Sequence, residues 1–181
     1  MRSIMGTTIP ILLATLLGMN AVASDAPGTA EGQVLTLLRG FEWQLDVDAL
    51  RAMPADTDKV LLNIARNDSY PIHIKSRAMA ALGQFPSDAL WRFLEAELAV
   101  AGSIERRRIV DTICQTFSAD RPGEVEVVIG DYLKQQDAHL RVNVARCLQA
   151  IGSVSALEKV KRYQKSTLES AHRWERDALN K

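Results

Sequence analysis

Apolar residues recur along the chain at the spacing of a helix that buries one face. In the segment from Leu140 to Gly152, positions 1, 5, 8, 9 and 12 are apolar, and the segment ends in glycine. The segment from Ile74 to Pro86 has the same pattern and ends in proline. Such spacing places apolar side chains on one side of an α-helix, and glycine and proline end it. Both segments are therefore predicted to be helices with one buried stripe.

Weaker copies of this pattern end at Pro54 and Phe117. Together with Pro86 and Gly152, these ends lie 32, 31 and 35 residues apart, an interval that fits two short antiparallel helices with tight turns. A further apolar helix is predicted before each copy. The chain is therefore expected to be all-α, with helix pairs at about 31–54, 57–86, 87–117 and 123–152 and a polar, capping pair at 153–181.

The pattern resembles the second helix of a HEAT repeat, and more closely the short HEAT-like repeats grouped with phycobilin lyases. Their signature, V-R-x-x-A-A-x-A-L-G-x-L-G, is matched by Leu140, Arg141, Val144, Ala145, Cys147, Leu148, Ile151 and Gly152. Gln149 replaces its first glycine, and in the earlier copy Pro86 replaces its last. The resemblance implies a right-handed α-solenoid, an alpha-alpha superhelix of about five helix pairs over 31–181. Repeats of this type mostly provide binding surfaces.

Local signals mark several predicted helix ends. Thr57 and Ser87 are predicted N-caps, since hydroxyl oxygens accept hydrogen bonds from the free amides of a helix start. The first pair is expected to break near Gly40 and to resume through Trp43 to residue 53, with Asp46 in a core position. This pair is the least regular, as terminal repeats commonly are.

The amino terminus has the pattern of a secretory signal peptide. A basic Arg2 precedes a short apolar run, which ends in the cleavage-site pattern Ala21-Val22-Ala23. The run is about half the roughly 20 residues that span a bilayer, so a permanent anchor is the less favoured alternative. We expect a signal peptide at 1–24, a linker at 25–30, and an exported protein that is periplasmic or extracellular.

Charge and cysteine content narrow the function classes. Without Arg2 the chain has 21 basic and 22 acidic residues, a balance that argues against general binding of nucleic acid. Export permits disulfides, but Cys114 and Cys147 fall at different positions of the repeat pattern. Their side chains are therefore expected to point in different directions, and buried free thiols are favoured over a disulfide.

The sequence carries no recognisable catalytic or metal-binding motif. His73, His139 and His172 are far apart and lack ligand-type neighbours at metal-binding spacing, and solvated histidine is the expected state of His73 and His139. No nucleophile elbow, phosphate-binding glycine loop or C-x-x-C motif is present. We therefore expect no cofactor, no metal and no catalysis. A lyase-like enzyme of the HEAT-like class remains an alternative, as does a self-associating structural protein of the cell envelope.

Positions 3, 4 and 7 of the second helices are predicted to face outward. In HEAT-like repeats the second helices line the concave surface, so the resemblance implies a mildly basic groove there. The candidate partner-binding residues of this groove are Arg77, Arg107, Arg108, Asp111 and Arg146. The hypothesis is that guanidinium groups bind an acidic or extended segment of another exported protein. The alternative is a solvated helix face with scattered charges.

Two further sets of residues receive specific interpretations. Lys75, Arg106 and Arg141 occupy position 2, where we expect structural pairing with a neighbouring acid or with a helix end. Trp43 and Trp174 fit apolar stripes and are expected in the core or cap. Trp91 lies one step off its stripe, so it is a candidate for partial exposure and for a partner contact on the convex side.

Overall fold

The protein is all-helical in the computed structural model, which describes residues 28–167 and 173–179. These residues form ten α-helices and one 3₁₀ helix, and no strand occurs among them. The helices are α1 (Ala30–Leu38), α2 (Val47–Arg51), α3 (Thr57–Arg66), α4 (Ile72–Leu82), α5 (Asp88–Val100), α6 (Ser103–Phe117), α7 (Pro122–Gly130), η1 (Asp131–Lys134), α8 (Ala138–Ile151), α9 (Val154–Thr167) and α10 (Arg173–Leu179).

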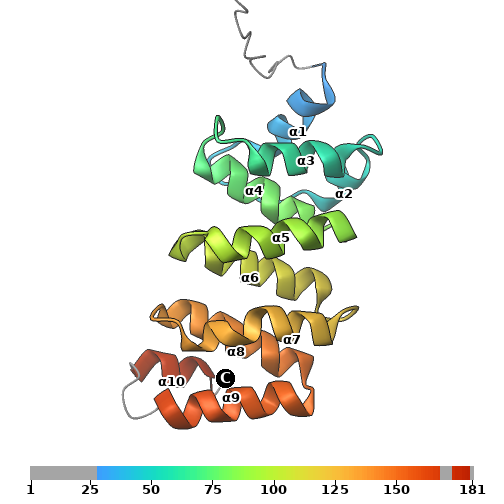
Figure 1. Ribbon diagram of the computed structural model, residues 1–181. Helices are drawn as coiled ribbons and strands as arrows, with labels where there is room; N and C mark the ends of the chain where they lie inside the picture. The colour runs from blue at the N-terminus through green and yellow to red at the C-terminus, as the bar shows by residue number, and fades with distance from the viewer. Residues whose placement is uncertain (1–27, 168–172, 180–181) are drawn as a thin grey trace, which may run out of the picture.

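The helices pack as successive pairs, in rows that run from α1 at one end to α9 and α10 at the other (Figure 1). Helices α4, α6 and α8 form one side of these rows, and α3, α5 and α7 the other (Figure 1). Contacts between α6 and α8 join Ser103 to Asp137 and Asp111 to Asn143. Because both residue numbers increase together, these two helices run parallel.

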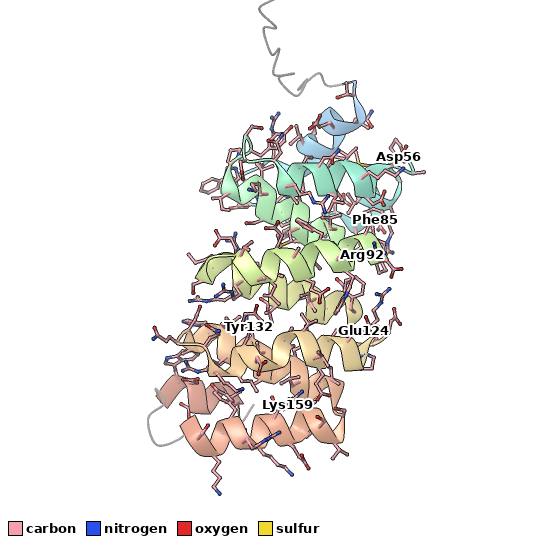
Figure 2. The ribbon with its side chains drawn as sticks, in the orientation of Figure 1. Asp56, Phe85, Arg92, Glu124, Tyr132 and Lys159 are labelled. Carbon is pink, nitrogen blue, oxygen red and sulfur yellow. A yellow bond between two sulfur atoms is a disulfide. The ribbon has the colours of Figure 1, made fainter. Side chains whose placement is uncertain are left out.

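The predicted apolar stripes form the core. In α4 the residues at positions 1, 5, 8 and 9 are buried, and so are the matching residues of α8: Ile74, Ala78, Ala81, Leu82, Leu140, Val144, Cys147 and Leu148. Side chains fill the space between the rows (Figure 2). Burial of one large aliphatic side chain contributes about 1.5–3 kcal/mol, so stacking stabilises helices too short to persist alone.

The helix starts were predicted with mixed success. Ser87 is the N-cap of α5, as expected, and its Oγ accepts a hydrogen bond from the Leu90 amide at 3.2 Å. The prediction for Thr57 was wrong, because Asp56 precedes α3 and Thr57 is its first residue. The Thr57 hydroxyl instead donates to the carbonyl of Pro54 at 2.7 Å. The Thr57 side chain, which was expected to cap α3, therefore stabilises the turn after Pro54 instead.

The first helix pair is more irregular than expected. Helix α1 ends before Gly40, whose φ of 120° favours glycine, but the next helix is limited to Val47–Arg51. Asp46 is not a core residue, since its carboxylate caps α2 by accepting from the Ala49 amide at 2.9 Å. Trp43 lies outside any helix, and its indole donates to the Leu37 carbonyl at 2.8 Å.

The expectation of free thiols was wrong, because Cys114 and Cys147 form a disulfide with their Cα atoms 5.8 Å apart. The two cysteines lie two positions apart in the repeat pattern, which is about 200° around a helix. Side chains that meet between neighbouring parallel helices must leave them from opposite edges. Because Cys114 and Cys147 occupy different positions of the repeat pattern, their side chains leave α6 and α8 from opposite edges and can meet. Cysteines at the same pattern position would point in the same direction and could not form this disulfide. The disulfide is consistent with an oxidising compartment.

The burial of Trp91 also differs from expectation. Trp91 is only 7% exposed and meets Phe117 edge to face, with ring centroids 5.2 Å apart, so its off-stripe position faces the end of α6 instead of solvent. Leu157 and Trp174 are each 39% exposed. Both lie in the last row, which has no further pair beyond it among the described residues (Figure 1).

The predicted signal peptide, residues 1–24, lies outside the described residues, as do Leu168, Ala171 and His172 of the predicted last helix. Thr29, in the predicted linker, caps α1 by accepting a hydrogen bond from the Gly32 amide at 3.0 Å. None of the helices within 28–167 and 173–179 is long and apolar enough to cross a membrane.

Candidate functional site

A pocket of about 520 Å³ opens between α4 and α6 on the outward side of the second helices. Three of the predicted groove residues line it: Arg77, Arg108 and Asp111. The remaining wall consists of Trp43, His73, Ser76, Ala80, Gly83, Gln84, Thr112, Gln115 and Thr116. On each of the two helices the lining residues recur at intervals of three or four. Residues at these intervals lie on the same face of a helix.

Gly83 and Thr116 bring α4 and α6 together at one end of the pocket. A Cβ atom at Gly83 would lie 3.1 Å from Thr116 Oγ1 and 3.2 Å from the Ala80 carbonyl oxygen, so little space remains beside the glycine. Thr116 Oγ1 is buried and has no hydrogen-bond partner in the described part of the chain. An unpaired buried hydroxyl costs free energy, which a ligand or a water that hydrogen-bonds to it would offset.

Arg77 lines the pocket but serves mainly as a structural residue. Its Nη1 donates to the carbonyl oxygens of Leu38, the last residue of α1, at 2.8 Å and of Gly40, just after the helix, at 3.0 Å. Its guanidinium also lies over the Trp43 ring, 5.2 Å from the centroid. Arg77 therefore holds the irregular first pair against α4, and much of its hydrogen-bonding capacity is used within the protein.

Arg108 is the exposed cation of the pocket. Its side chain donates a hydrogen bond to Ser76 Oγ across the gap between α6 and α4. It also lines a smaller cavity of about 240 Å³ together with Glu97 and Glu105. Because Ser76 is neutral, Arg108 keeps its full charge toward an incoming group.

Asp111 lies half-buried beside this cation. Burial raises the pKa of its carboxyl group, and the hydrogen bond from Asn143 Nδ2, at 3.1 Å to Oδ2, offsets only part of that effect. Burial disfavours a carboxylate because it removes the water that solvates the charge. The pocket thus places the exposed guanidinium of Arg108 next to a carboxyl group that protonates more readily than usual.

The other two predicted groove residues lie elsewhere. Arg107 Nε donates to Asp137 Oδ2 at 2.6 Å, and Asp137 also caps α8. Although burial opposes it, hydrogen bonds from Arg107, Ser103 and the Leu140 amide lower the pKa of Asp137 to about 2. Arg146 is exposed and donates to the Ala178 carbonyl of α10 at 3.2 Å. The five candidates therefore form one cluster of three and two separate residues.

The structural interpretation of position 2 is confirmed. Arg106 donates to the carbonyls of Leu98 at 3.3 Å and Ala101 at 2.6 Å, and so caps the end of α5. Lys75 pairs with Asp68 at 2.6 Å. Each of these two basic side chains thus bonds to the chain segment just before its own helix.

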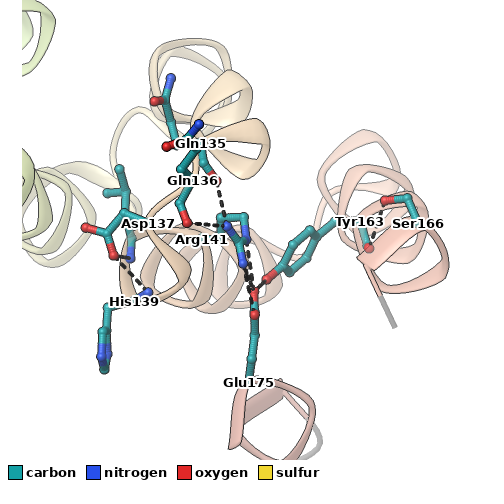
Figure 3. A network of polar contacts seen from close by, with 9 residues as sticks. Gln135, Gln136, Asp137, His139, Arg141, Tyr163, Ser166 and Glu175 are labelled. Carbon is teal, nitrogen blue, oxygen red and sulfur yellow. Dashed lines mark hydrogen bonds and ion pairs between the residues drawn. The ribbon is translucent and has the colours of Figure 1, made fainter. Parts of the chain in front are cut away.

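Arg141 makes the most extensive network of this type (Figure 3). It donates to the carbonyls of Gln135 and Gln136 at 2.6 and 2.8 Å and forms two hydrogen bonds of 3.0 Å with Glu175. Glu175 is only 1% exposed and also accepts from the hydroxyl of Tyr163. The network joins α8, α9 and α10, and its acid could not be assigned from the sequence because several acidic residues surround it in the last pair.

The exposed histidines agree with expectation. His73 lies at the rim of the α4–α6 pocket, and His139 stacks on Trp174 with ring centroids 4.5 Å apart. Among the residues that the structure describes, no cluster of three or more His, Cys, Asp or Glu side chains could hold a metal ion. The pocket residues that sequence reasoning missed are neutral, such as Gln84, Gln115 and Thr116, and carry no motif that would have identified them.

Comparison of the chain with protein-family models, with curated proteins and with solved structures gave no match. The fold and the site geometry therefore carry the functional argument.

Proposed function

We propose that this protein is an exported HEAT-like repeat scaffold, a right-handed α-solenoid that binds another protein along its second helices. The observation that carries the proposal is the pocket of about 520 Å³ between α4 and α6, the helices that match those lining the concave surface of HEAT-like repeats. It lies on regular, packed helices, which hold its residues more rigidly than loops would. The signal-peptide pattern and the Cys114–Cys147 disulfide support export.

The partner segment is proposed to be extended and acidic. Arg108 offers an exposed guanidinium at the pocket, and Arg146 offers a second one on α8, the next helix of the same side. Guanidinium groups bind carboxylates through two parallel hydrogen bonds, which favours an acidic side chain. Asp111 adds selectivity, since a partner group that can donate a hydrogen bond would satisfy its carboxyl group.

Site-specific photocrosslinking in the native compartment tests this proposal. A photoreactive residue at Ala80, which is exposed in the pocket, should crosslink one defined protein, identified by mass spectrometry. The control is the same residue at Ala89, which is exposed on α5. The variant Arg108→Glu should abolish the Ala80 crosslink, whereas Arg92→Glu on α5 should leave it unchanged. Crosslinking from Ala89 alone, or from neither position, would contradict the proposal.

Self-association is a second candidate, favoured by a group of exposed apolar side chains. Ile72, Val100 and Ile104 are 54%, 80% and 59% exposed, and they lie at the turns where α4, α5 and α6 begin or end. Exposed apolar side chains close to one another favour protein association. Sedimentation over a wide concentration range would then show a growing mass, and Ile104→Lys would prevent it.

A further inference from the structure

Another pocket formed by the described residues is larger than the one between α4 and α6. A pocket of about 1040 Å³ lies between the α7–η1 segment and α9, where Lys159 extends from α9 toward α7 (Figure 2). Among the described residues, its wall includes one carboxylate, Asp131, and five cationic side chains: Lys134, Arg141, Lys159, Arg162 and Lys165.

Two of these cations are neutralised by buried acids. Lys159 pairs with Glu126 at 2.7 Å, and Arg141 pairs with Glu175. Lys134 pairs with Asp131 at 3.0 Å, but both side chains are more than four-fifths exposed, so this pair is weak. Among the described residues, these three carboxylates offset three of the five cations, so two positive charges remain at the pocket.

The two remaining charges belong to Arg162 and Lys165. Both side chains are exposed on the pocket side of α9, and within the described residues neither has an acidic partner. Arg162 makes one long hydrogen bond, 3.4 Å, to the backbone carbonyl of Glu158. Both side chains therefore retain free N–H groups that can donate hydrogen bonds to an anion in the pocket.

The pocket also has an apolar wall. Val127, on α7, is 76% exposed, and Leu133, which is 8% exposed, also lines the pocket. An inorganic anion would leave most of this volume empty and Val127 uncovered. A ligand with an anionic head and an apolar body would use both features.

We propose that this pocket binds an organic phosphate, with the phosphate dianion against Arg162 and Lys165 and the apolar part against Val127. A phosphate monoester carries a charge of about −1.5 to −2 at pH 7, which matches the two uncompensated cations. Its three oxygens accept hydrogen bonds from guanidinium and ammonium groups together. The ligand is either a soluble phosphate monoester or the headgroup of a phosphate-bearing lipid, and this site is independent of the protein-binding proposal.

Isothermal titration calorimetry with phenyl phosphate tests the site on the purified protein. The double variant R162Q/K165Q should lose affinity about tenfold or more, because it removes two charge-assisted donors. The control R92Q/K161Q removes the same net charge from exposed residues that do not line the pocket, and its affinity should stay within about twofold. Thermal unfolding of both variants establishes that they are folded.

Two further arms identify the source and the charge of the ligand. Vesicles of phosphatidylcholine with and without phosphatidic acid test the lipid source, and binding that requires phosphatidic acid and Arg162 supports it. Phenyl phosphate affinity should fall between pH 7 and pH 5, since the second phosphate pKa is about 6, whereas benzenesulfonate should bind more weakly and without this change. The proposal is overturned if neither probe binds, if both double variants weaken binding equally, or if oligoglutamate binds as tightly as phenyl phosphate.

Discussion

Cys114 on α6 and Cys147 on α8 covalently join two neighbouring helices whose cysteines are 33 residues apart in the sequence. A crosslink stabilises a fold chiefly because it restricts the unfolded chain, and a loop of this length corresponds to about 3–4 kcal/mol. The disulfide therefore fixes the spacing of two successive pairs in the middle of the molecule (Figure 1).

Removal of this disulfide should destabilise the protein. We expect the double variant Cys114→Ser/Cys147→Ser to lose about 2–4 kcal/mol of unfolding free energy, measured by urea denaturation under oxidising conditions. The wild type with a thiol reductant should approach the stability of the variant. Equal stability of the oxidised wild type and the variant would show that the crosslink does not contribute.

The Arg141–Glu175 pair gives a second prediction. Glu175→Gln should cost about 2–4 kcal/mol, because it leaves the Arg141 guanidinium, 14% exposed, without its counter-charge. Asp177→Asn changes an exposed acid on the same helix and should be nearly neutral. Chemical denaturation compares the two variants. If both variants lost a similar unfolding free energy, the loss would come from the change in net charge and not from the buried Arg141–Glu175 pair.

Glu126 on α7 should make stability depend on pH in acid. Hydrogen bonds from Lys159, Ser155 and Ser153 lower the pKa of Glu126 from 4.5 to about 2. The folded state therefore favours the ionised carboxylate more than the unfolded state does. This contribution is complete above pH 4.5 and is lost as the pH falls from about 4.5 to about 2.

Glu126→Gln should accordingly reduce the acid sensitivity and cost about 1–2 kcal/mol at neutral pH. Urea denaturation between pH 2 and pH 7 measures both effects. Glu124→Gln is the matched control, since Glu124 is 60% exposed and its nearest ion-pair partner, Arg121, is 3.9 Å away. A Glu126→Gln curve parallel to the wild type would rule out this linkage.

Gly152 provides a backbone prediction. It ends α8 with a φ of 68°, and its amide donates to the Leu148 carbonyl at 3.1 Å. Gly152→Ala should cost about 1 kcal/mol, because a Cβ atom disfavours the left-handed conformation. Gly123→Ala, in open space in the first turn of α7, should be neutral or slightly stabilising. Thermal unfolding compares the two variants. A lower unfolding temperature for Gly123→Ala than for Gly152→Ala would contradict a role for Gly152 as the left-handed cap of α8.

Some features of the site followed from the sequence alone. The basic residues at position 2 were assigned a structural role, and Arg106 and Arg141 have it, because the turn before each helix supplies carbonyls at a fixed distance along the chain. Arg77, Arg108 and Asp111 were grouped by their common outward positions and do meet at one pocket. Arg107 does not line that pocket, and its guanidinium pairs with Asp137 in the turn before the next helix.

The sequence determined the local structure: the all-α class, most of the helices and their buried stripes, because the period of apolar residues acts within a few turns of one helix. Only the tertiary structure decided which helix edges meet. The Cys114–Cys147 disulfide, the Arg141–Glu175 pair and the basic pocket beside α9 all join residues from different helices. Contacts of this kind depend on the rotation of each helix against its neighbour, which the packing of the complete core sets and which no single helix pattern contains.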